Sequence, residues 1–140
     1  MAEKERKVAA TRDFSSLKWG HLPLSVFKNE RLSALEIIVK FLKEDIGLTH
    51  KEVSEIIGRH IGAVAITYSN AKKKFSGKLD VSDGEQIPVS IFLNRKLSVL
   101  ENLALYLSDK FTVNQISELL MKNPQTIYTV LRRARNKNGE

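Results

Sequence analysis

Apolar side chains recur along two segments of the chain at the spacing of three and four residues that gives a helix one buried face. These positions are Leu35, Ile38, Val39 and Leu42 in the first segment and Leu100, Leu103, Ala104 and Leu107 in the second. A short apolar stretch follows each segment, at residues 51–57 and 114–120, and a longer amphipathic stretch comes after a turn at residues 58–60 or 121–123. The pattern predicts an all-α protein with three helices in each half.

The two halves are copies of one another. LPLSVFKNERLSALE, residues 22–36, returns as IPVSIFLNRKLSVLE, residues 87–101, so that equivalent positions differ by 87 − 22 = 65. Two extra residues around Ile46 and Gly47 reduce this difference to 111 − 48 = 63, and residues 48–74 then match residues 111–137. We call residues 22–75 the first repeat and residues 87–137 the second repeat; each has a size that is normal for a three-helix unit.

The helix starts are marked by capping boxes, in which a Ser or Thr and a Glu or Gln three residues later each accept a backbone N–H. The four pairs are Ser33 with Glu36, Thr49 with Glu52, Ser98 with Glu101 and Thr112 with Gln115. In the second repeat, Asn123 suits the N-cap of the third helix and Pro124 its first turn. This order of elements predicts tandem helix-turn-helix modules joined by a short connector.

The segments outside the repeats differ from them in composition. Residues 1–21 are predicted to be a flexible basic tail, in which Trp19 either docks on the first repeat or anchors a partner, and residues 138–140 are a C-terminal tail. The connector, residues 76–86, has one basic and three acidic residues, 1 − 3 = −2, with Ser-Gly and Asp-Gly turn signals. Either it lets two separate units reach adjacent major-groove segments, or Leu79 and Val81 hold it down and the repeats pack as one body.

The opening phrase of each repeat places Pro and Phe before the first helix. We interpret Phe27 and Phe92 as aromatic lids over the end of each three-helix core. The alternative is that the polar residues beside them flank DNA or a polymerase; these are Asn29, Arg31, Arg95 and Lys96.

The stretch ISELLMKNPQTIYTVLRRARNK in the second repeat resembles region four of bacterial RNA polymerase sigma factors and related transcription regulators. In that family a short apolar helix leads through a turn into a recognition helix that ends in a basic run of the R-x-x-R-A-R type. The first repeat, VSEIIGRHIGAVAITYSNAKKK, keeps the apolar frame and Ala71 but has fewer polar residues. The resemblance implies a helix-turn-helix protein that binds DNA in transcription.

The third helix of the second repeat has side chains suited to reading DNA. Ile127, Leu131 and Ala134 share one face and are expected in the core. On the rest of the helix, Gln can pair with adenine, Arg with guanine or phosphate, and Thr with phosphate or a thymine methyl group. The predicted contact residues of this repeat are Lys122, Gln125, Thr126, Tyr128, Thr129, Arg132, Arg133 and Arg135. The alternative is a basic helix end that is only solvated.

In the first repeat, Val64, Tyr68 and Ala71 are expected in the core, and the opposite face is small and partly apolar. Either that face packs against thymine methyl groups and sugars, or it binds a protein, because an exposed Ile in the middle of the helix needs an apolar partner. The predicted contact residues of this repeat are His60, Ile66, Asn70, Lys72, Lys73 and Lys74.

Composition narrows the possible partners. The chain has 23 basic and 16 acidic residues, a net charge of +7, which favours a polyanion. There is no cysteine, and His21, His50 and His60 have no ligand spacing, so neither a metal nor another cofactor is expected. No apolar run is long enough for a membrane span and the charged N-terminus does not resemble a signal peptide, so we expect a cytoplasmic, nucleoid-associated protein.

No motif supports catalysis, since the sequence contains neither a phosphate-binding glycine loop nor a nucleophile elbow. We predict a non-enzymatic protein that binds double-stranded DNA as a transcription regulator or sigma-like factor, with RNA polymerase or a second copy of the chain as further partners. Two alternatives stay open. One is an adaptor, for example on RNA polymerase, that uses the first repeat, and the other is an architectural or segregation protein with little sequence preference.

Overall fold

The computed structural model describes residues 20–82 and 84–139, and this part of the chain is mostly helical, as predicted. In chain order the elements are β1 (His21–Pro23), the 3-10 helix η2 (Leu24–Phe27), α2 (Ala34–Lys40), the π-helical segment η3 (Phe41–Ile46), α3 (His50–Ile57), α4 (Ile61–Lys74), β2 (Gln86–Pro88), the 3-10 helix η4 (Val89–Leu93), α5 (Val99–Leu107), α6 (Val113–Leu120) and α7 (Pro124–Lys137). The predicted tail lies outside the described residues, Trp19 included, except that Gly20 and His21 belong to the fold.

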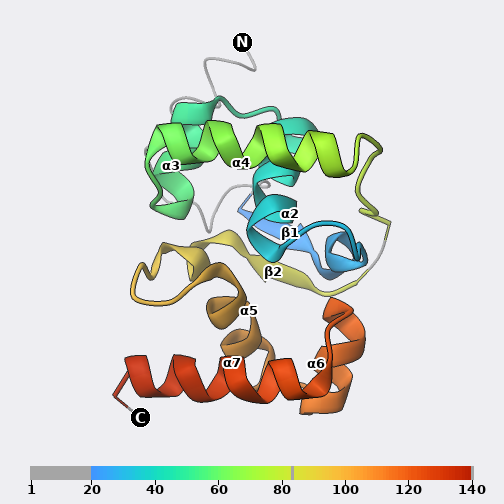
Figure 1. Ribbon diagram of the computed structural model, residues 1–140, viewed down its shortest axis with the longest axis vertical. Helices are drawn as coiled ribbons and strands as arrows, with labels where there is room; N and C mark the ends of the chain where they lie inside the picture. The colour runs from blue at the N-terminus through green and yellow to red at the C-terminus, as the bar shows by residue number, and fades with distance from the viewer. Residues whose placement is uncertain (1–19, 83, 140) are drawn as a thin grey trace.

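The prediction of an all-α protein is wrong in one feature, because β1 and β2 form a small antiparallel sheet between the two repeats (Figure 1). Leu22 lies opposite Ile87 at its centre, and both side chains are fully buried. Each strand has three residues and contains a proline. Such a segment is too short to show the alternating pattern by which a strand is recognised in a sequence.

The sheet relates the two repeats by an approximate twofold axis. The backbone N–H of Leu24 donates to the carbonyl oxygen of Glu85 at 2.8 Å, and the N–H of Val89 donates to the carbonyl oxygen of Gly20 at 2.7 Å. Since 24 + 65 = 89 and 20 + 65 = 85, the axis exchanges these two hydrogen bonds. In Figure 1 a half-turn in the plane of the picture brings α2 to the place of α5 and α4 to the place of α7.

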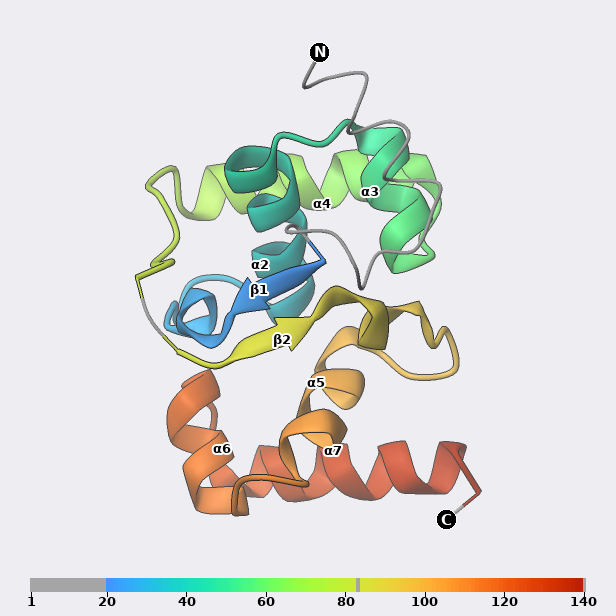
Figure 2. The same ribbon diagram turned by 180° about the vertical axis from the view of Figure 1, so that it is seen from behind.

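The opening segments interlock the two repeats. Each 3-10 helix lies between the first helix of its own repeat and the second helix of the other, because η2 contacts α2 and α6 while η4 contacts α5 and α3. Phe27 is buried and lines a small cleft together with Leu100, Leu103 and Leu120 of the second repeat. The interpretation of the phenylalanines as lids over their own repeat is incomplete, because each opening segment also packs against the second helix of the other repeat. The rear view in Figure 2 shows the backbone of both segments.

The polar residues of the opening phrase shape its turns. The Asn29 side chain accepts the backbone N–H of Arg31 at 2.9 Å, and the Asn94 side chain accepts that of Lys96 at 3.1 Å. The asparagines, which are equivalent in the two repeats, thus have a local structural role of the kind that asparagine often takes in turns.

All four predicted capping boxes are present, at the starts of α2, α3, α5 and α6. The two extra residues of the first repeat, around Ile46 and Gly47, fall at the end of the π-helical segment η3, where Gly47 has φ 87°. A π-helical turn takes up an additional residue without breaking the helix. The first helices therefore differ in length while both lead to an equivalent second helix.

The buried side chains of both repeats form one continuous hydrophobic core. Leu79 of the connector is only 6% exposed and joins this core, whereas Val81 is 46% exposed. The Ser25 hydroxyl donates to the carbonyl oxygen of Asp80 at 2.7 Å and holds the connector against η2. The repeats thus pack as one body, with Leu79 but not Val81 holding the connector down.

Candidate nucleic-acid interface

The turn between α6 and α7 sets the direction of α7. α6 ends at Met121, whose φ of 55° is left-handed. Asn123 then caps α7, its side-chain oxygen accepting the N–H of Gln125 at 2.7 Å, and Pro124 occupies the first turn. The N-cap and proline predicted for this helix are both confirmed.

One face of α7 is buried and the rest is open to solvent. The buried side chains are Ile127, Val130, Leu131 and Ala134. Of the predicted contact residues, Gln125, Thr126, Tyr128, Arg132, Arg133 and Arg135 are exposed, whereas Lys122 and Thr129 are half-buried. Within the described part of the chain, none of the three arginines forms an ion pair. Their charges are available to an external anion.

The last turn of each third helix is tied to the first helix of its repeat. Lys137 donates to both carboxylate oxygens of Glu101, at 2.8 and 3.1 Å, and Lys74 donates to Glu36 at 2.8 Å. Burial raises the pKa of both carboxyls, but hydrogen bonds from the lysines and from the N-cap serines outweigh it and hold each pKa below its ordinary value. Lys74, a predicted DNA contact, already has an internal partner, and the sequence did not single out Lys137.

The turn before α4 lies close to a side chain of the second repeat. Gly58 ends α3 with φ 67°, and a Cβ at this position would lie 2.6 Å from Nε of Arg95 in the second repeat. His60 caps α4, its Nδ1 accepting the N–H of Gly62 at 3.0 Å. One ring nitrogen of His60, a predicted phosphate contact, is thus engaged within the turn.

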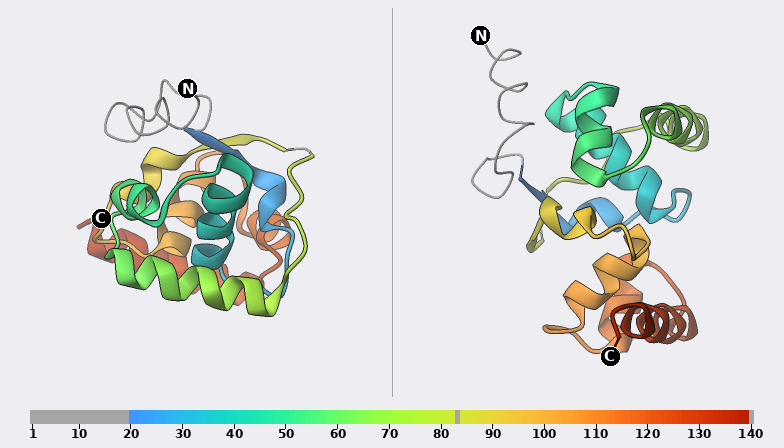
Figure 3. Two further views of the ribbon diagram at one scale, coloured as in Figure 1. Left: turned by 90° about the horizontal axis from the view of Figure 1, so that it is seen from above. Right: turned by 90° about the vertical axis from the view of Figure 1, so that its left-hand side faces the viewer.

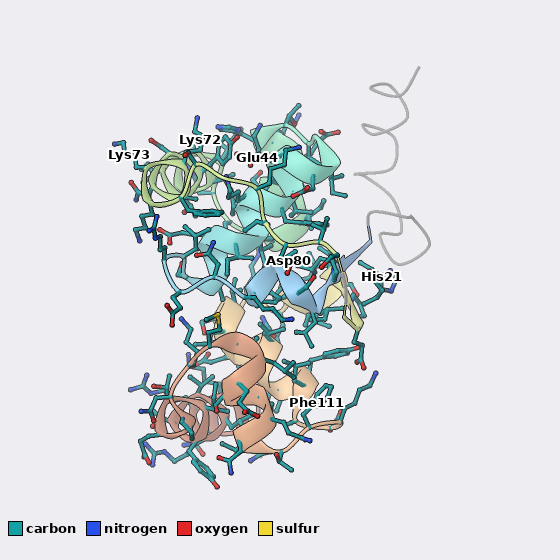
Figure 4. All side chains as sticks on the ribbon, turned by 90° about the vertical axis from the view of Figure 1, so that its right-hand side faces the viewer. His21, Glu44, Lys72, Lys73, Asp80 and Phe111 are labelled. Atoms are coloured by element: carbon teal, nitrogen blue, oxygen red, sulfur yellow. The ribbon has the colours of Figure 1, made fainter. Side chains whose placement is uncertain are left out.

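The outer face of α4 is partly apolar, as predicted. Val64 and Ala71 are buried, while Ile66 is 64% exposed and Asn70 and Lys73 are also exposed. In Figure 4, Lys73 lies on the outer side of α4 and Lys72 lies nearer to Glu44.

Tyr68 of α4 occupies the position of Leu131, since 131 − 63 = 68, and it is half-buried. Its hydroxyl donates to Glu44 at 2.9 Å, Lys72 lies 4.6 Å from the ring centroid, and the His50 ring meets it edge-on at 6.0 Å. Burial, followed by Glu44, raises the pKa of Tyr68, whereas burial, followed by two nearby lysines, lowers the pKa of His50. Lys72, another predicted DNA contact, stacks on this ring.

An open groove of about 590 Å³ lies beside α7 in the second repeat. Its walls come from the end of α5, the start of α6 and one flank of α7. The residues that line it are Ser108, Phe111, Thr112, Val113, Ile116, Tyr128, Leu131, Arg132, Arg135 and Asn136. The sequence indicated Tyr128, Arg132 and Arg135 as DNA contacts but contained no signal for the hollow between them, because its walls come together only in the folded protein.

The two third helices share one face of the molecule. α4 and α7 lie at opposite ends of that face and run in opposite directions, as Figures 1 and 3 show from three sides. The approximate twofold axis passes between them. The exposed side chains of both helices are thus presented by repeats that share one hydrophobic core.

In the part of the chain that the structure describes, no three histidine or acidic side chains gather as they would around a metal ion, and no helix has the length and apolarity needed to cross a membrane. Comparison with protein-family models, curated proteins and solved structures finds no match to this chain. A function must therefore be inferred from the residues of the chain itself.

Proposed function

We propose that this protein binds duplex DNA through two helix-turn-helix modules, α3 with α4 and α6 with α7. The observation that carries the proposal is the antiparallel placement of α4 and α7 on one face, about an approximate twofold axis. Dimeric helix-turn-helix proteins present their recognition helices to successive major grooves in this way. Here both helices would come from one chain.

α7 is the stronger candidate for reading base edges. Gln125 and Thr126 are exposed in its first turn, where side chains of a recognition helix reach the bases. Arg132 and Arg133 follow on the open surface, with no ion pair among the described residues, and suit phosphates or guanine. The net charge of +7 favours the same polyanion.

α4 supplies a different surface. Ile66, 64% exposed, offers a methyl-rich side chain that fits a thymine methyl group better than a hydrogen-bonding base edge. Lys73, exposed beside it, suits a phosphate. The same Ile66 favours a second candidate function, an adaptor that binds a protein such as RNA polymerase through α4.

The biological role that follows is regulation of transcription, or a sigma-like function, on the nucleoid in the cytoplasm. A second copy of the chain and RNA polymerase are the further partners of this proposal. An architectural or segregation protein would use the same helices but would depend on phosphate contacts alone.

A salt titration with matched variants tests the proposal. Binding to duplexes selected from a random library is measured by fluorescence anisotropy at several salt concentrations for wild type, R132A/R133A and K28A/K78A. The two double variants lose the same charge, but Lys28 and Lys78 are exposed outside α4 and α7. If both arginines contact phosphates, only R132A/R133A lowers the slope of log K against log salt, by about 1.8.

The outcomes separate the candidates. No binding at low salt contradicts every role on DNA and leaves the adaptor. Binding that unrelated DNA competes away indicates an architectural protein, whereas retained discrimination indicates a regulator. Equal slopes for the two double variants would show that α7 is not the DNA-binding surface.

A further inference from the structure

The groove beside α7 has an apolar floor and a basic edge. Phe111, Val113 and Ile116 come from the start of α6 and the residues before it, and Leu131 closes the floor from α7. The volume of about 590 Å³ is in the range of sites that bind ligands or inserted side chains.

The first repeat contains the same place in a filled state. Equivalent positions differ by 63, so Tyr68 corresponds to Leu131, His50 to Val113 and Lys72 to Arg135. The Tyr68 ring lies edge-on to His50 at 6.0 Å, with Lys72 at 4.6 Å from its centroid. One repeat thus shows an aromatic ring held under a basic side chain where the other has a shorter leucine and an open groove.

The filled place also includes a carboxylate. The Tyr68 hydroxyl donates to Glu44 at 2.9 Å, so that ring, acid and cation form one group. In the second repeat Arg132 and Arg135 line the groove, but no acidic side chain does. Neither arginine has an ion pair among the described residues. The second repeat lacks the ring, and Asp109, its residue equivalent to Glu44 (109 − 44 = 65), does not line the groove.

We propose that the groove binds an acidic segment of a partner protein that inserts an aromatic side chain, with carboxylates on Arg132 and Arg135. The ring takes the place that Tyr68 fills in the first repeat, and the partner's carboxylates pair with the two arginines, since no acidic side chain of the second repeat lines the groove. Arginine suits such a partner because its guanidinium can both stack on an aromatic ring and bind a carboxylate through two hydrogen bonds.

This binding stands apart from the proposed function, since it uses the flank of α7. Tyr128, Arg132 and Arg135 belong both to the groove and to the predicted DNA surface. If the proposed function holds, the acidic segment and DNA exclude one another, and the partner acts as a regulator of DNA binding. Only this competition rests on the proposed function.

The test begins with a selection of short random peptides on the full-length protein. The enriched peptides are synthesised with a fluorescent label, and their affinities are measured by anisotropy. We expect Phe, Tyr or Trp accompanied by Asp or Glu in the enriched sequences. Failure to enrich peptides, or enrichment of basic or purely aliphatic ones, would overturn the proposal.

Matched variants then locate the binding. L131Y introduces the residue of the first repeat into the groove and should weaken binding at least about tenfold, as should R135E. R133E makes the same charge change at an exposed position that does not line the groove, and Y68L alters only the first repeat; both should bind like wild type. Circular dichroism confirms that each variant is folded.

R135E keeps the test decisive if L131Y does not fold, because Arg135 is exposed. Binding that neither L131Y nor R135E weakens would place the peptide elsewhere and refute the groove. A DNA measurement on wild type separates the two proposals, because absence of DNA binding with intact peptide binding contradicts only the proposed function.

Discussion

The second helix of each repeat ends at an equivalent residue, and the two residues differ in how easily they adopt the backbone conformation found there. Gly58 and Met121 both have left-handed conformations, with φ 67° and φ 55°. Such a conformation costs a residue with a Cβ about 1–2 kcal/mol, whereas glycine adopts it freely. The second repeat therefore carries a strain that the first avoids.

G58A should lower the free energy of unfolding by about 1–2 kcal/mol, because alanine is strained at this φ and its Cβ would meet Arg95. M121G should raise it by about 0.5 kcal/mol, since relief of the strain exceeds the extra chain entropy of glycine. Urea unfolding followed by circular dichroism measures both.

The double variant G58A/R95A is the control for the clash. Its free energy of unfolding should fall by less than the sum of the decreases in G58A and R95A, because removing the Arg95 side chain leaves only the backbone strain. If G58A and M121G shift stability in the same direction, backbone conformation does not explain the difference between the turns.

At the scale of the elements, the sequence predicted the helices well because the signals that start them are local. Each capping box joins residues three positions apart, and all four formed as expected. The ion pair from Lys74 to Glu36 spans 38 residues, so no local pattern revealed it. The sequence therefore showed Lys74 only as one more member of a basic helix end.

These ion pairs predict a dependence of stability on pH. The pKa values of Glu36 and Glu101 are lowered on folding, so their contribution to stability is present above the ordinary carboxyl pKa. It is lost as the pH falls through their folded pKa values. The urea midpoint of wild type should therefore fall as the solution is acidified below the ordinary glutamate pKa of 4.5.

E36Q/E101Q is the matched variant. Glutamine can still accept the N-cap N–H, as Gln115 does from Thr112 at 2.8 Å, but it carries no charge to titrate. The variant should be less stable than wild type at neutral pH, and the difference should shrink on acidification. A difference that stays constant with pH would show that the ion pairs do not contribute through these carboxylates.

At the scale of the whole molecule, the interlocked opening segments make the repeats one cooperative unit. Leu22 and Ile87 face each other at the centre of the sheet and are both 0% exposed. L22A and I87A should each lower the free energy of unfolding by about 2–5 kcal/mol, the range for large-to-small changes in a core.

Both variants should unfold in one transition, with amide hydrogen exchange lost together in α2 and α5. V81A is the control, because Val81 is 46% exposed and its change should stay within about 0.5 kcal/mol. If I87A lost protection from amide hydrogen exchange in the second repeat alone, the result would contradict cooperation across the sheet.

The sequence by itself determined the repeat, the helix starts, and the buried face formed by Ile127, Leu131 and Ala134, because caps and periodicity act over a few residues. The tertiary structure decided how the repeats pair, and nothing local could indicate that Phe27 lies beside residues of the opposite repeat as well as its own. It also decided which charges stay available, since Lys74 has an internal carboxylate while Arg132 has none among the described residues. The groove beside α7 was likewise decided by the tertiary structure, because its walls come from three helices that only folding brings together.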